Sequence, residues 1–159
     1  MVAEWLQRLL ILQDRDSKCD LIERQLADIP FEIKKEESAI AGLEEALALR
    51  KAGLKELEVR RKDLEGQVAQ AEDQVLKYKT QQMQVKKNEE YTALEHEIST
   101  LQEKVSELED VELQLMEEIE TGEADLAEAR DSTEKQRHTL ETHIIRLRAN
   151  YESFAGELD

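Results

Sequence analysis

The sequence predicts an all-α protein, a long antiparallel coiled-coil hairpin whose two helical arms reverse near Asn88. Its composition is the first reason: of 159 residues, 38% are charged and 4% aromatic, with five glycines and one proline. Such a composition is typical of long helices and coiled coils. Two further observations are an apolar repeat of seven residues and an unequal distribution of acidic and basic residues between the arms.

The first predicted element is an N-terminal helix over residues 1–29. Its apolar residues share one face at helical spacing: Val2, Trp5, Leu9, Leu12, Cys19 and Leu26. Pro30 follows, and the residue before a proline is biased away from the helical conformation. The first arm is therefore expected to be kinked or broken near Ile29, and a kink is favoured over a full reversal.

The next predicted element is the first coiled-coil arm, residues 31–86. Two series at seven-residue spacing run through it: Ile33, Ile40, Leu47, Leu54, Arg61, Val68, Val75, Gln82; and Glu36, Leu43, Arg50, Leu57, Leu64, Ala71, Tyr78, Val85. The phase does not slip. A strict period of 3.5 residues over this length predicts a left-handed supercoil rather than a solitary surface helix.

A hairpin turn is predicted at residues 87–90, followed by the second arm at 91–158. Asparagine tolerates the left-handed conformation that a tight reversal requires, so Asn88 is placed at the tip. Facing residues then have numbers that sum to 176, twice 88. This register pairs apolar or small residues along the arms: Val85 with Tyr91, Leu57 with Ile119, Leu54 with Gly122, and Ile29 with Leu147.

Charge supports the same pairing of arms. Residues 89–128 contain fifteen acids and one base, whereas residues 31–87 contain eleven acids and twelve bases. The register sets a basic cluster opposite the acidic residues 114–126; its members are Arg50, Lys51, Lys55, Arg60, Arg61 and Lys62. Flanking charges of opposite sign select the partner and orientation of coiled-coil helices. A parallel self-dimer would stack the acidic arm on its own copy.

Charge and hydropathy also limit the partners. The net charge of −16 disfavours binding of nucleic acid or anionic membrane by this segment and favours basic partners. No run approaches the roughly 18 apolar residues of a membrane span. The apolar start, Met1 to Leu12, has neither a basic n-region nor a cleavage site. A cytoplasmic protein is expected.

No catalytic, cofactor or metal site is predicted, and the chain is not expected to be an enzyme. Cys19 is the only cysteine, which excludes an internal disulfide and a cysteine cage for zinc. The histidines, His96, His138 and His143, lack the Glu-x-x-His spacing of helical metal sites. A two-stranded coiled coil also offers no pocket that shifts carboxylate pKa values apart.

Two surfaces are candidates for binding protein partners. The first is the hairpin tip: Lys86, Lys87, Asn88, Glu89, Glu90 and Tyr91. The plainer interpretation of its lysines is that they keep an exposed turn solvated and complement a helix C-terminus. The second is the open end, where residues 1–16 should overhang the second arm and leave Trp5, Leu6, Leu9 and Leu12 uncovered. A further domain, a second copy or a partner protein would cover them.

The tip also resembles a known family. Its signature reads roughly Gln-x-x-x-Val-Lys, a short polar stretch, then Glu-(Tyr/Phe)-x-Ala-Leu-x-x-Glu-Ile. It is matched by Gln81, Val85, Lys86, Glu90, Tyr91, Ala93, Leu94, Glu97 and Ile98. The family comprises bacterial proteins that join a coiled-coil hairpin to a C-terminal C4-type zinc ribbon. The ribbon's Cys-x-x-Cys pairs are absent here, so only the coiled-coil part is present. Zinc is expected only if a full-length protein carries the ribbon.

The resemblance implies a non-catalytic adaptor or chaperone, with links to flagellar or type III secretion and to an alternative sigma factor. Two alternatives stay open. One is a structural spacer or oligomeric rod, with a homodimer formed through the open end. The other is the helical stalk of a zinc-ribbon nucleic-acid-binding protein whose ribbon lies elsewhere. The identity of the protein partner does not follow from the sequence.

Overall fold

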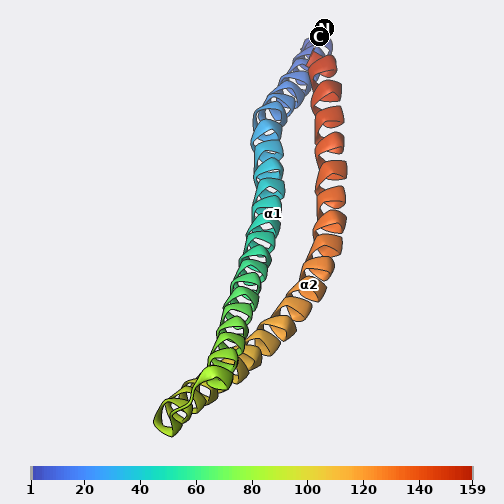
Figure 1. Cartoon of the computed structure of the whole chain (residues 1–159). Helices are drawn as coiled ribbons and strands as arrows, with labels where there is room; N and C mark the ends of the chain where they lie inside the picture. Colours follow the sequence, from blue (N-terminus) through green and yellow to red (C-terminus); the bar gives the residue numbers. More distant parts are fainter. Residues whose placement is uncertain (1, 159) are drawn as a thin grey trace. The chain divides into compact units, whose positions relative to one another are not determined.

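The computed structural model describes residues 2–158 as two helices in an antiparallel hairpin. Helix α1 spans Val2–Gln84 and helix α2 spans Asn88–Leu158. Figure 1 shows the two helices joined at the short connection between them. The predicted all-α hairpin is confirmed. Met1, assigned to the first helix from the sequence, and the side chain of Val2 lie outside the described residues. No helix in the described part of the chain is long and apolar enough to cross a membrane.

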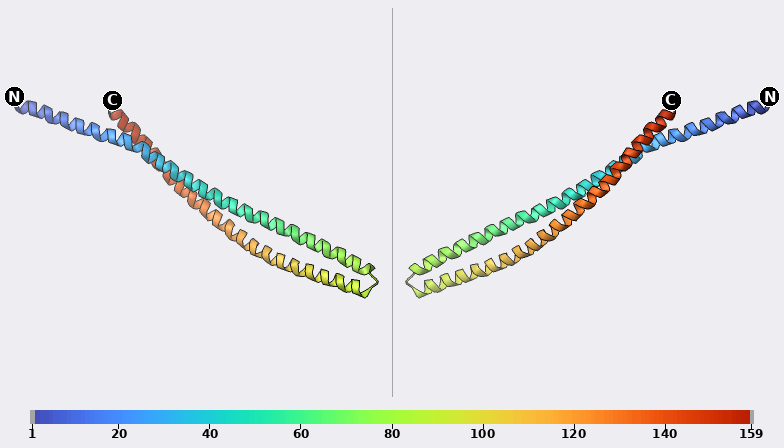
Figure 2. Two further views of the ribbon diagram at one scale, coloured as in Figure 1. Left: turned by 90° about the vertical axis from the view of Figure 1, so that its left-hand side faces the viewer. Right: turned by 90° about the vertical axis from the view of Figure 1, so that its right-hand side faces the viewer.

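The chain divides into two compact units. The open-end unit contains the described residues of 1–47 and 130–159, and the tip unit contains residues 48–129. Each unit pairs a piece of α1 with a piece of α2. In the open-end unit the N-terminal part of α1 continues past the end of α2, and in the tip unit the two helices run side by side to the turn (Figure 2).

The core is a seam between the helices. Among the described residues, the buried side chains are all apolar: Ile29, Ala71, Val75, Ile98, Leu115, Ile119, Ile144 and Leu147. Ala71 and Val75 belong to the heptad series of the first arm, and Ile29, Ile119 and Leu147 belong to pairs that the predicted register brings together. Side chains on the stripes are mostly half-buried and those between them are exposed, as expected for two helices that cover only one face of each other.

The predicted register is confirmed in the tip unit by one close approach. A Cβ atom built on Gly122 would lie 3.0 Å from Cδ1 of Leu54, its predicted facing residue. Leu54 therefore fills the space that the missing side chain leaves. A glycine in a helix interior costs about 1 kcal/mol relative to alanine, and here it accommodates a larger residue on the other helix.

The turn differs from the prediction. The connection is residues 85–87, not 87–90, and Asn88 is the first residue of α2 rather than a left-handed tip residue. No residue of the described range has a positive φ angle. The second helix begins early because Glu89 and Glu90 suit its first turn, where carboxylates interact favourably with the helix dipole.

Of the two predicted outcomes at Pro30, a kink or a break, the break is excluded, because α1 runs through this proline as continuous helix. A full reversal is excluded for the same reason. Figure 1 shows the blue N-terminal part of α1 inclined to the part that follows, in agreement with the favoured kink. Proline removes one hydrogen bond of the helix. The neighbouring Ile29, which is only 7% exposed, keeps the chain packed against the seam at this point.

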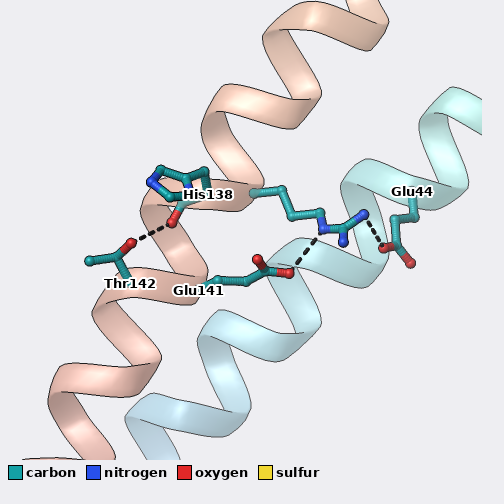
Figure 3. Close-up of polar contacts among 5 residues, drawn as sticks. Glu44, His138, Glu141 and Thr142 are labelled. Atoms are coloured by element: carbon teal, nitrogen blue, oxygen red, sulfur yellow. Dashed lines mark hydrogen bonds and ion pairs between the residues drawn. The ribbon is translucent and has the colours of Figure 1, made fainter.

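Polar contacts between the helices flank the seam in the open-end unit. The guanidinium of Arg137 lies between two carboxylates: Nε donates to Oε1 of Glu141 at 2.9 Å, and Nη1 lies 3.7 Å from Oε1 of Glu44 across the seam (Figure 3). Its hydrogen bond to Glu141 raises the pKa of Arg137 above its usual value. Arg148 and His143 make further contacts across the seam, with Glu37 at 3.2 Å and Glu36 at 3.5 Å.

Candidate functional site: the hairpin tip

The tip surface comprises the six predicted residues Lys86, Lys87, Asn88, Glu89, Glu90 and Tyr91, and all six are exposed. They occupy the end of the connection and the first turn of α2. The local fold brings them together, because the amide of Tyr91 donates to the carbonyl of Lys87 at 3.1 Å and so closes the first turn. The hydroxyl of Thr92 donates to the carbonyl of Asn88 at 2.9 Å.

The side chain of Gln82 joins the two helices next to the connection. Gln82 occupies an inward-facing position of α1, and its Nε2 donates to Oε2 of Glu95 at 2.6 Å and to the carbonyl of Tyr91 at 3.4 Å. Both acceptors belong to α2. The amide therefore joins the two helices within two turns of the connection. A polar residue at a single inward position is a known means of fixing coiled-coil register.

Beside the connection the surface is hollowed. A depression of about 540 Å³ is lined by residues of both helices and of the connection: Gln81, Gln84, Val85, Lys86, Glu90, Ala93 and Leu94. Val85, Ala93 and Leu94 supply its apolar lining, whereas Lys86 and Glu90 supply charges of opposite sign. Apolar contact area with a few placed polar groups is the usual pattern of a binding site. Met83, in the last turn of α1, is 87% exposed.

The lysines of the tip do not lie within the last turn of α1, where they would complement the dipole at the C-terminus of the helix. The last turn of α1 contains no basic residue, and Lys86 and Lys87 lie beyond it, in the connection. In the described structure neither forms an ion pair, whereas Lys77 is 3.4 Å from Asp73 on the same helix. Two solvated cations next to the carboxylates of Glu89 and Glu90 leave the tip surface dipolar.

The open end also has the predicted exposure. We call residues 3–21 the overhang, because every one of them is exposed and the first partly covered residue is Ile22. The predicted docking residues are exposed to different degrees: Trp5 64%, Leu6 49%, Leu9 38% and Leu12 57%. The predicted overhang ended at residue 16, so it is five residues longer than expected. Three more large apolar side chains in it are exposed: Leu10, Ile11 and Leu21.

The basic cluster makes one ion-pair contact with α2, and its acid, Glu112, lies just outside the predicted window of residues 114–126. Within the described chain, only Arg61 of the basic cluster comes within 4.0 Å of an acid on α2: its Nε lies 3.8 Å from Oε1 of Glu112 and 3.3 Å from Oε1 of Glu65 on its own helix. That Nε is buried without a hydrogen bond. The other members of the cluster are exposed, including Arg50, which the heptad series placed on the seam.

Sequence reasoning missed the polar contacts of the open-end unit. There the acids Glu36, Glu37 and Glu44 belong to α1, and the partners Arg137, His143 and Arg148 belong to α2. The sequence did contain a sign of these contacts, because basic residues occur in the last third of the second arm, which is otherwise acidic. Within the described residues, no group of three or more His, Cys, Asp or Glu side chains has a geometry that holds a metal ion.

Comparisons with known proteins agree with this fold. Residues 12–158 match the family model of the CT398-like coiled coil hairpin domain. The structure of CT398 from Chlamydia trachomatis is similar, with a TM-score of 0.83 and 22% sequence identity over 96% of this chain. The chain covers 64% of the Chlamydia chain, which is less than two thirds of it. At this identity the likeness concerns the fold. A search of curated proteins found no match.

Proposed function

The chain belongs to the family of CT398-like coiled coil hairpin domains, and from this premise we propose that it is a non-catalytic adaptor that presents its hairpin tip to a protein partner. The observation that carries the proposal is the depression beside the connection, which is lined by apolar residues and by charges of both signs. The same short segment supplies the exposed tip surface. A turn that served only to reverse the chain would need neither feature.

The contacts around the tip support a rigid presentation of this surface. Gln82 joins α1 to Glu95 and to the carbonyl of Tyr91, and the seam resumes at Ile98, which is 3% exposed. The candidate binding residues are thus attached to packed helices rather than to a long loop. Binding loses less affinity to conformational entropy when the surface is already ordered.

The resemblance of the tip signature to zinc-ribbon hairpin proteins supports a finer proposal, in which the partner belongs to a secretion or flagellar apparatus or is an alternative sigma factor. On this proposal the protein works in the cytoplasm, as an adaptor or chaperone, without a cofactor in this segment. A zinc ribbon in a longer form of the protein is part of the same proposal, and any binding of nucleic acid would belong to that ribbon.

The test is a charge reversal at the tip. The double substitution Lys86→Glu with Lys87→Glu removes the cation that lines the depression, Lys86, and the cation next to it. We expect it to weaken binding of the partner at least tenfold. Helicity should not change, because both side chains are exposed and lie outside the two helices. A second variant, Ala93→Arg, places a bulky side chain in the depression from an exposed position and leaves the seam unaltered.

A matched control is Lys34→Glu with Lys35→Glu, which makes the same change in net charge at exposed positions of the open-end unit. In a pull-down from native lysate, we look for proteins that bind the wild type and the control but neither tip variant. Each such protein is then purified and titrated against the chain. Equal affinity of such a partner for the wild type and both tip variants would show that the tip is only a turn. Loss of binding in the control as well would assign the effect to net charge.

A further inference from the structure

The overhang is an apolar helical face that the rest of the chain does not cover. Five of its large side chains lie on one side of α1 at helical spacing: Trp5, Leu6, Leu9, Leu10 and Leu12. Their exposed fractions run from 38% to 64%. Elsewhere in the described structure the exposed large apolar residues are spread along both helices, and single apolar residues are normal on a protein surface. A contiguous patch of this kind marks an interaction site.

From this face we infer that the overhang is the interface of a homodimer, in which the overhangs of two copies pack against each other in antiparallel orientation. The inference goes beyond the proposed role of the tip and does not depend on it.

The exposed area meets the requirement of a dimer. Five half-exposed side chains of this size present on the order of 100 Å² each, or about 500 Å² per copy. A symmetric interface uses the same patch twice, so about 1,000 Å² would be buried in total. This is the lower limit for a specific interface between proteins. The expected dimer is weak, because its interface lies at this lower limit.

Charge favours a second copy over a basic protein or a membrane. Residues 3–21 contain four acids (Glu4, Asp14, Asp16, Asp20) and three bases (Arg8, Arg15, Lys18), which gives a net charge of −1, against −16 for the whole chain. Two of the pairs are already satisfied within the helix, Arg8 with Glu4 and Lys18 with Asp14, both at 3.1 Å. A nearly neutral face can approach its own copy, whereas it offers no charge that attracts a strongly charged partner.

The orientation follows from Asp16. This residue lies four positions after Leu12 on the same stripe as Trp5 and Leu9. In a parallel symmetric pair each residue faces its own copy, so two Asp16 carboxylates would meet in the seam, at a cost. Antiparallel pairing centred near Leu9 and Leu10 separates them and gathers the apolar side chains. It also sets the two Cys19 residues more than about 20 Å apart, at 1.5 Å of rise per residue.

The sequence provides two probes for the test. Trp5 is the only tryptophan and Cys19 the only cysteine, and both lie in the overhang. We expect the mass measured by sedimentation and light scattering to rise from 18.4 kDa towards twice that value as the concentration of the full chain increases. Trp5 emission should shift to shorter wavelength over the same range. Oxidation should not link the two chains through Cys19.

The matched variants are Leu9→Glu and Leu76→Glu. Both replace an exposed leucine of α1 with the same charge, but Leu76 lies in the tip unit and is 64% exposed. Leu9→Glu should stay at 18.4 kDa with unchanged helicity, and Leu76→Glu should dimerise like the wild type. A constant monomer mass for the wild type, or a dimer that Leu9→Glu leaves intact, would overturn the proposal. Ready formation of a Cys19 disulfide would overturn the antiparallel arrangement.

Discussion

The contact between Leu54 and Gly122 gives a quantitative test of the seam. Replacing Gly122 with alanine improves helix propensity by about 1 kcal/mol. The new Cβ, however, would lie 3.0 Å from Cδ1 of Leu54, closer than carbon atoms normally pack. Gly66 provides the control, because a Cβ added there has no neighbour within 4 Å. We expect Gly66→Ala to stabilise the protein by about 1 kcal/mol, and Gly122→Ala by at least about 0.5 kcal/mol less.

A larger side chain sharpens the comparison. Gly122→Leu requires Leu54 to leave its position and should destabilise the protein by about 1–3 kcal/mol. Leu54→Ala alone leaves a gap and should also destabilise it. The double variant exchanges the large and small residues across the seam, so the two costs should largely cancel. We expect a favourable coupling energy of about 1–2 kcal/mol between Leu54→Ala and Gly122→Leu.

The assay is urea unfolding followed by circular dichroism, at a concentration where the protein is monomeric. In thermal unfolding, 1 kcal/mol corresponds to a shift of roughly 2–4 °C in Tm for a chain of this length. Additive effects of Leu54→Ala and Gly122→Leu, with a coupling energy near zero, would refute the reasoning, because residues that do not touch do not couple. Equal stabilisation by Gly122→Ala and Gly66→Ala would also refute the close contact between position 122 and Leu54.

Two further changes test the polar and proline positions of the seam. Replacing Arg61 and Glu112 together with leucine should leave stability unchanged or raise it by about 1 kcal/mol, because the Nε of Arg61 is buried without a hydrogen bond while the rest of the pair is partly exposed. A fall in the urea midpoint would show that this pair stabilises the hairpin. Pro30→Ala restores an amide donor inside a continuous helix, so Tm should rise, by an amount corresponding to at most about 3 kcal/mol. A lower Tm for Pro30→Ala would mean that the bend is required for packing.

The seam could be predicted from the sequence because it depends on one periodic property. Heptad spacing identified Ala71 and Val75 as inward-facing, the register did the same for Ile119, and all three are buried. The stripe drifts only near its ends, since a helix has 3.6 residues per turn rather than 3.5. Tyr91 lies on the predicted stripe but is 48% exposed, because it is in the first turn beside the connection, where the other helix has already ended.

The polar part of the molecule could not be predicted in the same way. Residue spacing places a charge on a face, but whether it meets a partner depends on side-chain reach and on competition with water. Arg61 pairs with Glu112 because its position on the seam directs its guanidinium to the other helix. The neighbouring Arg60 and Lys62 point away from the seam and remain solvated. Exposed pairs contribute only about 0.2–1 kcal/mol, too little to be encoded strictly in the sequence.

The connection also lay beyond the reach of sequence rules. Asn88 was expected to supply a left-handed residue at the tip, since such turns usually need one. The chain instead reverses through residues 85–87 with no positive φ among the described residues. Where each helix stops is decided by its last packed contacts, here those of Gln82 with Tyr91 and Glu95. Local composition does not reveal these contacts.

The backbone conformation of this connection affects how the protein can evolve. Residues 85–87 need neither glycine nor any other residue of unusual conformational freedom. The exposed positions Lys86 and Lys87 can therefore accept many different side chains without a change of fold. The paired helices can then stay unchanged while the exposed residues of the connection vary. Recognition of a new partner can arise by substitution at these positions alone, and the same hairpin can serve as a starting point for engineered binding.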